Sequence, residues 1–279
     1  MGELTEPASS WAIAVAQFAP TDDREDNRRQ IAELVAAAEA RGATLVVLPE
    51  YSAYFHKEFG PHWAEAAEPL DGPFVTALAE LAARHDVTVV AGLAERVAEG
   101  PPDADRFSNT IVAVSPDGSV VATYRKMHLY DAFGQRESDW IVPGGLDQDP
   151  FFDLDGLRVG VQTCYDLRFP EVTRRLVDGG ADLVLLPSEW VRGPLKEHHW
   201  RTLVTARAIE NTVYVAAADH APPIGAGNSL IVDPMGVALA GVGETTDVAV
   251  AVISRQRVDE VRAVNPALQL RRFRVEPLD

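Results

Sequence analysis

RGATLVVLPE at residues 41–50 and GGADLVLLPSE at residues 179–189 follow one pattern, and the choice of fold rests on them. Each has a glycine, then a continuous apolar run, then a proline where that run ends. A short continuous apolar run is typical of a strand that is covered on both faces. The repetition predicts two similar halves, each with strands inside and helices outside. The alternative is that any buried strand that follows a helix has this appearance.

Segments with helix-like and strand-like patterns alternate along the rest of the chain. The expected helices cover residues 24–41, 73–85, 170–177, 194–211 and 254–264, and the expected strands cover 11–18, 44–49, 87–94, 181–187 and 212–218. Hairpins are expected at 109–126 and 151–164, and a meander through 228–253. Helices that alternate with strands and hairpins predict a layered α/β or α+β sandwich.

Composition and length favour one large domain. The chain has 279 residues, of which 47% are hydrophobic, and no linker-like stretch divides it. We therefore expect a flexible tail at residues 1–10 and a single domain over residues 11–279. The formal net charge of −17, from 25 basic and 42 acidic residues, would repel a phosphate backbone and argues against nucleic acid as a partner. The simpler interpretation of this charge is solubility.

The single cysteine, Cys164, bears on the compartment. One cysteine cannot form a disulfide within the chain, which suits a reducing cytosol. The N-terminal sequence MGELTEPASS is acidic and polar, unlike a signal peptide. No apolar run approaches the roughly 20 residues that span a bilayer. We expect a soluble, cytoplasmic protein.

Cys164 is also the first candidate for chemistry. It ends the alternating segment LRVGVQTC, and Pro170 then begins the expected helix. A thiol at a strand-to-helix turn lies near free backbone N–H groups, which would favour a thiolate and later an oxyanion. The alternative is a buried, inert cysteine. The polar neighbours Gln162, Thr163 and Asp166 weaken that alternative.

Glu50 and Lys126 are the other two candidates. Glu50 follows the buried run of 44–49, at the carboxyl end of a strand, where ligand sites of α/β proteins form. Lys126 ends the hairpin of 109–126 beside aromatic and apolar residues, and its charge would stabilise an oxyanion and help to keep Cys164 ionised. The alternatives are a solvated loop acid and a surface lysine.

Three strings in fixed order, LVVLPE (45–50), YRKMHLYD (124–131) and GVQTCYDLRFPE (160–171), resemble the nitrilase superfamily of carbon–nitrogen hydrolases. Within it, the last string is similar to the Nit-type amidase branch, which includes omega-amidases and deaminated-glutathione amidases. The resemblance runs from about Trp11 to Phe273. It implies a four-layer α-β-β-α sandwich.

The resemblance also assigns roles. Glu50 would be the general base, Cys164 the nucleophile and Lys126 the oxyanion stabiliser. Glu137, in QRESDWIVPG, would be a further catalytic residue that orients Lys126 or the substrate. The backbone N–H of Tyr165 would complete the oxyanion hole. The resemblance implies no metal and no cofactor. Members of the family pair their subunits through helices, so we expect a homodimer or larger oligomer with an interface near Val172, Leu176 and Val177.

The segment SEWVRGPLKEHHW (188–200) departs from the omega-amidases, which carry a Thr-Gly pair there. Trp190 and Arg192 in this segment, with Arg168 four residues past Cys164, are the expected substrate contacts. A buried arginine can hold a carboxylate through two hydrogen bonds, so we expect a small amide whose other end carries a carboxylate. The alternatives for Arg168 are a pair with Asp166 or Glu171. Carbamoyl amino acids and aliphatic amides remain alternative substrates.

Three other classes of function compete with this interpretation. A metal hydrolase is disfavoured because the seven histidines form neither HExxH nor an HxH pair on a strand. A cysteine–histidine hydrolase would use His128 or His220 as its base and would leave Glu50 and Lys126 without a role. A non-catalytic binding protein of the same fold is disfavoured because all three catalytic positions are present.

Overall fold

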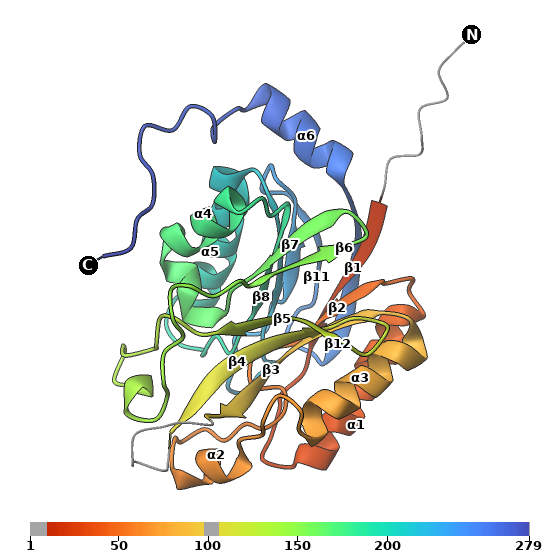
Figure 1. Ribbon diagram of the computed structural model, residues 1–279, viewed down its shortest axis with the longest axis vertical. Helices are drawn as coiled ribbons and strands as arrows, with labels where there is room; N and C mark the ends of the chain where they lie inside the picture. Colours follow the sequence, from red (N-terminus) through yellow and green to blue (C-terminus); the bar gives the residue numbers. More distant parts are fainter. Residues whose placement is uncertain (1–9, 98–105, 279) are drawn as a thin grey trace.

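Two six-stranded sheets form the centre of the protein, and the computed structural model describes them within residues 10–97 and 106–278 (Figure 1). The first sheet contains β1 (Ser10–Gln17), β2 (Leu45–Val47), β3 (Thr88–Arg96), β4 (Phe107–Val114), β5 (Val120–Arg125) and β12 (Asp247–Ser254). The second contains β6 (Phe151–Leu154), β7 (Leu157–Val161), β8 (Leu183–Pro187), β9 (Tyr214–Ala218), β10 (Leu230–Val232) and β11 (Ala238–Gly241). Their strand orders are β12-β1-β2-β3-β4-β5 and β11-β10-β9-β8-β7-β6.

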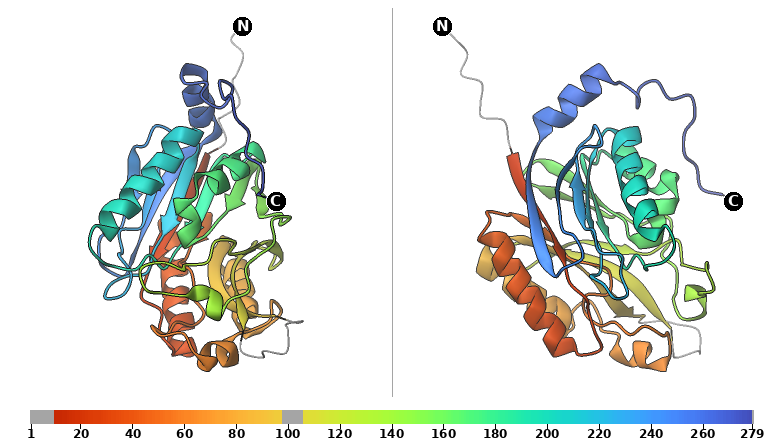
Figure 2. Two further views of the ribbon diagram at one scale, coloured as in Figure 1. Left: turned by 90° about the vertical axis from the view of Figure 1, so that its left-hand side faces the viewer. Right: turned by 180° about the vertical axis from the view of Figure 1, so that it is seen from behind.

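Helices cover the outer face of each sheet (Figure 2). The first sheet carries α1 (Arg24–Glu39) and α3 (Pro73–His85), and the second carries α4 (Pro170–Asp178) and α5 (Lys196–Asn211). The remaining helical segments are α2 (Pro61–Ala66), α6 (Arg255–Val264) and two short 3₁₀ turns, η1 (Glu137–Asp139) and η2 (Cys164–Arg168). The expected four-layer α-β-β-α sandwich is confirmed. Within the residues described, no helix combines the length and the apolar character needed to cross a membrane.

The two similar stretches, 41–50 and 179–189, lie at corresponding places in the two sheets. Strand β2 runs parallel to β1 and β3, and β8 runs parallel to β7 and β9. Alternate residues of each strand face opposite layers. Leu45 of β2 and Leu183 of β8 enter the core between the sheets, whereas Val46 and Val184 pack under the helices. Burial on both faces explains why each strand is a continuous apolar run.

The expected meander through 228–253 is wrong in one respect. Strands β10 and β11 pair within the second sheet, but β12 crosses to the first sheet and pairs antiparallel with β1. The turn residues near 233–236 locate the reversal of the chain, but they carry no information about which sheet receives the following strand. Strand β12 covers the edge of β1 along that strand's whole length, from Ser10 to Gln17. Residues 1–9 of the expected tail lie outside the described residues, and Ser10 already begins β1.

Gly92 of β3 lets the loop that carries Glu50 lie against the sheet. The Gly92 N–H donates to the carbonyl of Pro49 at 3.1 Å, and the N–H of Ala53 donates to the carbonyl of Gly92 at 3.2 Å. A methyl group at Gly92 would lie 2.6 Å from the backbone nitrogen of Tyr51 and 2.7 Å from the Cα of Glu50. These neighbours are backbone atoms, which cannot rotate away.

We therefore predict that Gly92→Ala lowers the free energy of unfolding by about 1–3 kcal/mol, because the added methyl overpacks the contact between β3 and the loop. Urea denaturation followed by circular dichroism measures this change. Gly243→Ala is the matched control, since no heavy atom lies within 4 Å of the methyl group that it adds. Equal stability of the two variants would contradict the prediction.

Candidate active site

A cavity of about 110 Å³ opens where the carboxyl ends of the central strands of both sheets meet. The expected site residues that line it are Glu50, Lys126, Glu137, Cys164, Tyr165, Arg168 and Trp190. Glu50 follows β2, Lys126 follows β5, Glu137 begins η1 and Cys164 begins η2. The structure thus brings together residues separated by up to 140 positions in the chain.

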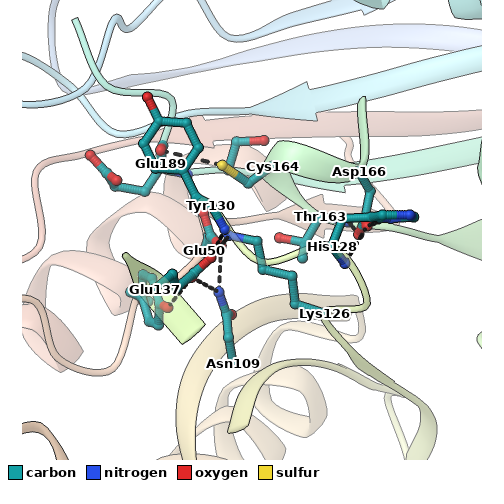
Figure 3. A network of polar contacts seen from close by, with 12 residues as sticks. Glu50, Asn109, Lys126, His128, Tyr130, Glu137, Thr163, Cys164, Asp166 and Glu189 are labelled. Atoms are coloured by element: carbon teal, nitrogen blue, oxygen red, sulfur yellow. Dashed lines mark hydrogen bonds and ion pairs between the residues drawn. The ribbon is translucent and has the colours of Figure 1, made fainter. Parts of the chain in front are cut away.

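Lys126 lies between two buried carboxylates (Figure 3). Its Nζ donates to Glu50 Oε1 and to Glu137 Oε1, each at 3.0 Å, and the three side chains are no more than 3% exposed. Burial alone would lower the pKa of Lys126, but Glu137 and Glu50 outweigh it and hold that pKa well above its ordinary value. Lys126 is therefore a permanent cation in this site.

Other hydrogen-bond donors surround the carboxylates of Glu50 and Glu137. Asn109 Nδ2 donates to Glu50 Oε1 at 2.5 Å, and the backbone N–H of Glu189 donates to Glu50 Oε2 at 2.6 Å. Glu137 accepts from the Tyr51 hydroxyl at 2.9 Å and from the backbone N–H of Tyr130 at 2.5 Å. Buried charges are stable only when such partners surround them, so the positions of both carboxylates are fixed.

Cys164 sits on a tight turn. Strand β7 ends at Val161, three residues earlier than the sequence pattern suggested, and Cys164 adopts a left-handed backbone conformation with φ of 44°. Such a conformation is uncommon for a residue other than glycine and is maintained by its surroundings. Asp166 holds the turn, because its carboxylate accepts from the Thr163 N–H at 3.2 Å and from the Tyr124 hydroxyl at 2.6 Å. The Cys164 thiol donates to the carbonyl of Glu189 at 3.4 Å.

The surroundings of Cys164 disfavour its thiolate form. Burial, and then the carboxylate of Glu50, raise the pKa of Cys164 well above its ordinary value, and Lys126 offsets this only in part. This direction runs against the expectation that the turn and Lys126 keep Cys164 ionised, because Lys126 is shared by two carboxylates. A nucleophilic Cys164 would need a base in the same cavity.

Arg168 and Arg192, the two arginines expected to contact substrate, have different surroundings. The Arg168 guanidinium lies 4.6 Å from the centre of the Trp190 ring, and no carboxylate of the described residues pairs with it, Asp166 and Glu171 included. Arg192 lies outside the cavity lining and pairs with Glu197 at 3.4 Å and Glu244 at 3.2 Å. Arg192 is engaged on the surface, so we do not assign it a substrate contact.

Three cavity or network residues escaped the sequence analysis: Asn109, Glu189 and Lys196. Asn109 is a buried amide near the start of β4, where the neighbouring Ser108 and Thr110 are polar and buried too, so the sequence alone does not single it out. Glu189 lines the cavity, and its Oε1 is buried without a hydrogen-bond partner. Burial, and then Glu50, raise the pKa of Glu189 well above its ordinary value. Lys196 begins α5 and points toward Tyr130, whose hydroxyl it contacts at 2.8 Å.

The two histidines considered as alternative bases have other partners. His128 Nδ1 lies 2.8 Å from Asp166 Oδ1, and the His128 ring stacks on Phe169. His220 Nε2 lies 2.6 Å from the carbonyl oxygen of Glu50, and burial lowers the pKa of His220 to about 4, so that it is a neutral donor. The described residues that line the cavity include neither histidine. Over residues 10–97 and 106–278, no group of three or more His, Cys, Asp or Glu side chains is placed to share a metal ion.

Comparison with known proteins agrees with this geometry. Residues 12–263 match the family described as carbon-nitrogen hydrolase. A curated relative from Escherichia coli O157:H7, named deaminated glutathione amidase, is 38% identical over 261 residues, which are 94% of this chain and 97% of the relative. A solved carbon-nitrogen hydrolase from Helicobacter pylori has a TM-score of 0.84 and 26% identity, with 94% of this chain and 95% of the other covered.

A second solved structure is that of a single-site mutant of an amidase from Nesterenkonia, with a TM-score of 0.78, 27% identity and 97% of each chain covered. That amidase is described with the acetamide moiety of fluoroacetamide added covalently at its active-site cysteine. The family match spans most of this chain, and the relatives cover it almost completely. The chain therefore belongs to the carbon–nitrogen hydrolase family of the nitrilase superfamily, whose members act on carbon–nitrogen bonds other than peptide bonds.

Proposed function

We propose that the protein is an amidase that hydrolyses a small, carboxylate-bearing amide through a thioester on Cys164. Glu50 is the general base and Lys126 the oxyanion stabiliser. The observation that carries this proposal is the link through residue 189: its N–H holds Glu50 at 2.6 Å, and its carbonyl accepts from the thiol of Cys164 at 3.4 Å. One short piece of backbone therefore sets the base and the nucleophile in a common cavity.

The first half of the reaction forms the thioester. Glu50 removes the proton of the Cys164 thiol as sulfur bonds to the amide carbonyl carbon, and the carbonyl electron pair moves to oxygen. Lys126 and the backbone N–H of Tyr165 stabilise this oxyanion. The oxyanion then collapses, Glu50 returns its proton to the nitrogen, the carbon–nitrogen bond breaks, and ammonia or an amine leaves.

The second half releases the acid. Glu50 takes a proton from water as the water oxygen attacks the thioester carbon. The second oxyanion collapses, the carbon–sulfur bond breaks, and the sulfur of Cys164 recovers the proton from Glu50. Glu137 has a positioning role, because its contact with Lys126 at 2.9 Å fixes the ammonium against Glu50.

The names of relatives support an amide substrate. One relative is called a deaminated glutathione amidase, and the Nesterenkonia enzyme is called an amidase. Arg168, in the cavity and free of carboxylate partners among the described residues, supports a substrate that carries a carboxylate. Omega-amides of 2-oxo acids and deaminated glutathione have this form, as do carbamoyl amino acids. A reducing compartment such as the cytoplasm would keep Cys164 as the thiol that the reaction needs.

We predict that the wild-type protein releases ammonia or an amine from one of these carboxylate-bearing amides faster than from a neutral aliphatic amide. Cys164→Ser should lower kcat/KM by roughly 10³-fold or more, because it removes the nucleophile, and should leave the thermal midpoint within a few degrees of wild type. Coupled detection of ammonia and scanning calorimetry provide the two measurements. Activity of Cys164→Ser within tenfold of wild type would end the thiol mechanism.

A second prediction concerns the protonation of Cys164, the only thiol in the chain. The probe is methyl methanethiosulfonate, which contains no amide and whose sulfur is attacked by thiolates with loss of methanesulfinate. Because the pKa of Cys164 is raised, the reagent should react more slowly with Cys164 at pH 7 than with free cysteine. The rate should rise with pH through a midpoint above the ordinary value of about 8.5. Glu50→Gln removes the nearby anion and should move that midpoint down. Glu137→Gln, whose carboxylate has a weaker effect on Cys164, should move it less.

We also propose a homodimer or larger closed oligomer. The interface expected near Val172, Leu176 and Val177 is not available, because these side chains are buried within the protomer. Exposed apolar side chains occur instead at Ile209 of α5 and at Val237, before β11, which lie on neighbouring segments.

Light scattering at micromolar concentration should therefore give at least twice the mass of one chain. Val237→Glu should shift the equilibrium toward the monomer by placing a charge in an apolar contact. A monomer in the wild-type protein would contradict this proposal without affecting the amidase.

A further inference from the structure

Two cations in the cavity lack the counter-charges that surround Lys126. Lys196 is only 8% exposed, and its Nζ donates to the neutral hydroxyl of Tyr130 at 2.8 Å. Arg168 has a buried Nε without a hydrogen-bond partner, and its Nη2 lies 3.5 Å from His199 Nδ1. Among the described residues, neither cation forms an ion pair with a carboxylate. Buried cations normally have such partners.

Aromatic rings place these two cations beside one another. The Lys196 Nζ lies 4.1 Å from the centre of the Phe133 ring and 5.6 Å from that of Trp190. The Arg168 Cζ lies 5.7 Å from the Phe133 centre and 4.6 Å from the Trp190 centre. Aromatic faces attract cations but do not neutralise them. The same two rings therefore hold two positive charges together.

The acids that face Lys196 do not supply the missing charge. Burial raises the pKa of Tyr130 to about 12, and burial also raises the pKa of Glu189 and of Cys164 well above their ordinary values. In each of the three groups the shift opposes the charged form. Burial, and then Arg168, lower the pKa of Lys196, which is the mark of a cation without a counter-charge. An anion placed between Lys196 and Arg168 would offset the repulsion between them and favour the charged form of Lys196.

We propose that Lys196 and Arg168 together bind the carboxylate of the substrate, and that Lys196 is a specificity-determining residue. This inference rests on the proposed amidase function and names the anionic end of its substrate. Arg168 offers the planar donor group and Lys196 a point charge. The segment 188–200 thus contributes a cation to the cavity, but the cation is Lys196 rather than Arg192. The matching substrates are short chains with a neutral amide at Cys164 and a carboxylate at the cation pair.

The kinetic test compares two amides of nearly equal shape, the anion succinamate and the neutral 4-methylpentanamide. Lys196→Met removes the charge and keeps much of the side-chain volume. We expect KM for succinamate to rise by roughly 10- to 100-fold, the size of one charge-assisted hydrogen bond, with kcat within about threefold. KM for 4-methylpentanamide should change by less than about threefold. Lys196→Arg should recover most of the affinity for succinamate.

Arg192→Met is the matched control, since it removes one positive charge four positions away in the chain but outside the cavity. It should alter KM for succinamate by less than about twofold. An equal rise for succinamate and 4-methylpentanamide in Lys196→Met would show a merely structural role. An equal rise for succinamate in Arg192→Met would show long-range electrostatics. Either result would overturn the proposal.

A binding experiment separates this proposal from the amidase function. Calorimetric titration of Cys164→Ala with butanoate and with 1-butanol needs no turnover. We expect butanoate to bind more tightly, and Lys196→Met in the same background to weaken butanoate alone by tenfold or more. If Lys196→Met weakens the binding of butanoate alone and the wild-type protein hydrolyses none of the amides, the anion site is supported and the amidase function is rejected. Hydrolysis of amides with no effect of Lys196→Met on either ligand would sustain the amidase and reject the anion site.

Discussion

The contact on which the rest of the site depends is the ammonium of Lys126 held between the carboxylates of Glu50 and Glu137, at 3.0 and 2.9 Å. The three residues come from the ends of separate elements, so one buried cation fixes three loops. Removing one member of such a network leaves an uncompensated charge, at a cost of about 3–5 kcal/mol. The same contact that stabilises this region therefore determines where the proposed base and oxyanion stabiliser lie.

The packing of the two sheets places Cys164, the proposed nucleophile, in the same cavity as this network. Glu50 follows β2 in one sheet, and Glu189 follows β8 in the other. The backbone of Glu189 contacts both Glu50 and Cys164, and His220 holds the carbonyl of Glu50 at 2.6 Å. The distance between the proposed base, Glu50, and the proposed nucleophile, Cys164, therefore depends on how the two sheets pack face to face. The site forms only when both sheets are packed together, because Glu50 and Lys126 follow strands of the first sheet and Cys164 follows a strand of the second.

The sequence predicted what depends on local pattern and missed what depends on contacts between distant segments. The apolar runs of β2 and β8, the hairpins and every helix longer than α2 follow from periodicity and turn residues, and the motifs around Glu50, Lys126 and Cys164 identified the family. The destination of β12 did not follow, since β1 lies more than 200 positions away in the chain. Asn109, Glu189 and Lys196 were missed for the same reason: each gains its importance from residues that only the folded chain brings near. The direction of the pKa shift of Cys164 did not follow from the sequence either, because only the folded chain brings two carboxylates to Lys126.

Three cations that line the cavity, Lys126, Lys196 and Arg168, differ in whether a carboxylate pairs with them. Lys126 has two carboxylate partners, so its charge is balanced within the protein whether or not a substrate is bound. Lys196 and Arg168 face neutral groups and aromatic rings, so their balance is incomplete until an anion arrives. A chain of net charge −17 repels anions at long range, and a local pair of positive charges is what would offset that field inside the cavity. Because the anion would sit at this pair and the neutral amide at Cys164, the same charge arrangement would both select the substrate and orient it for attack.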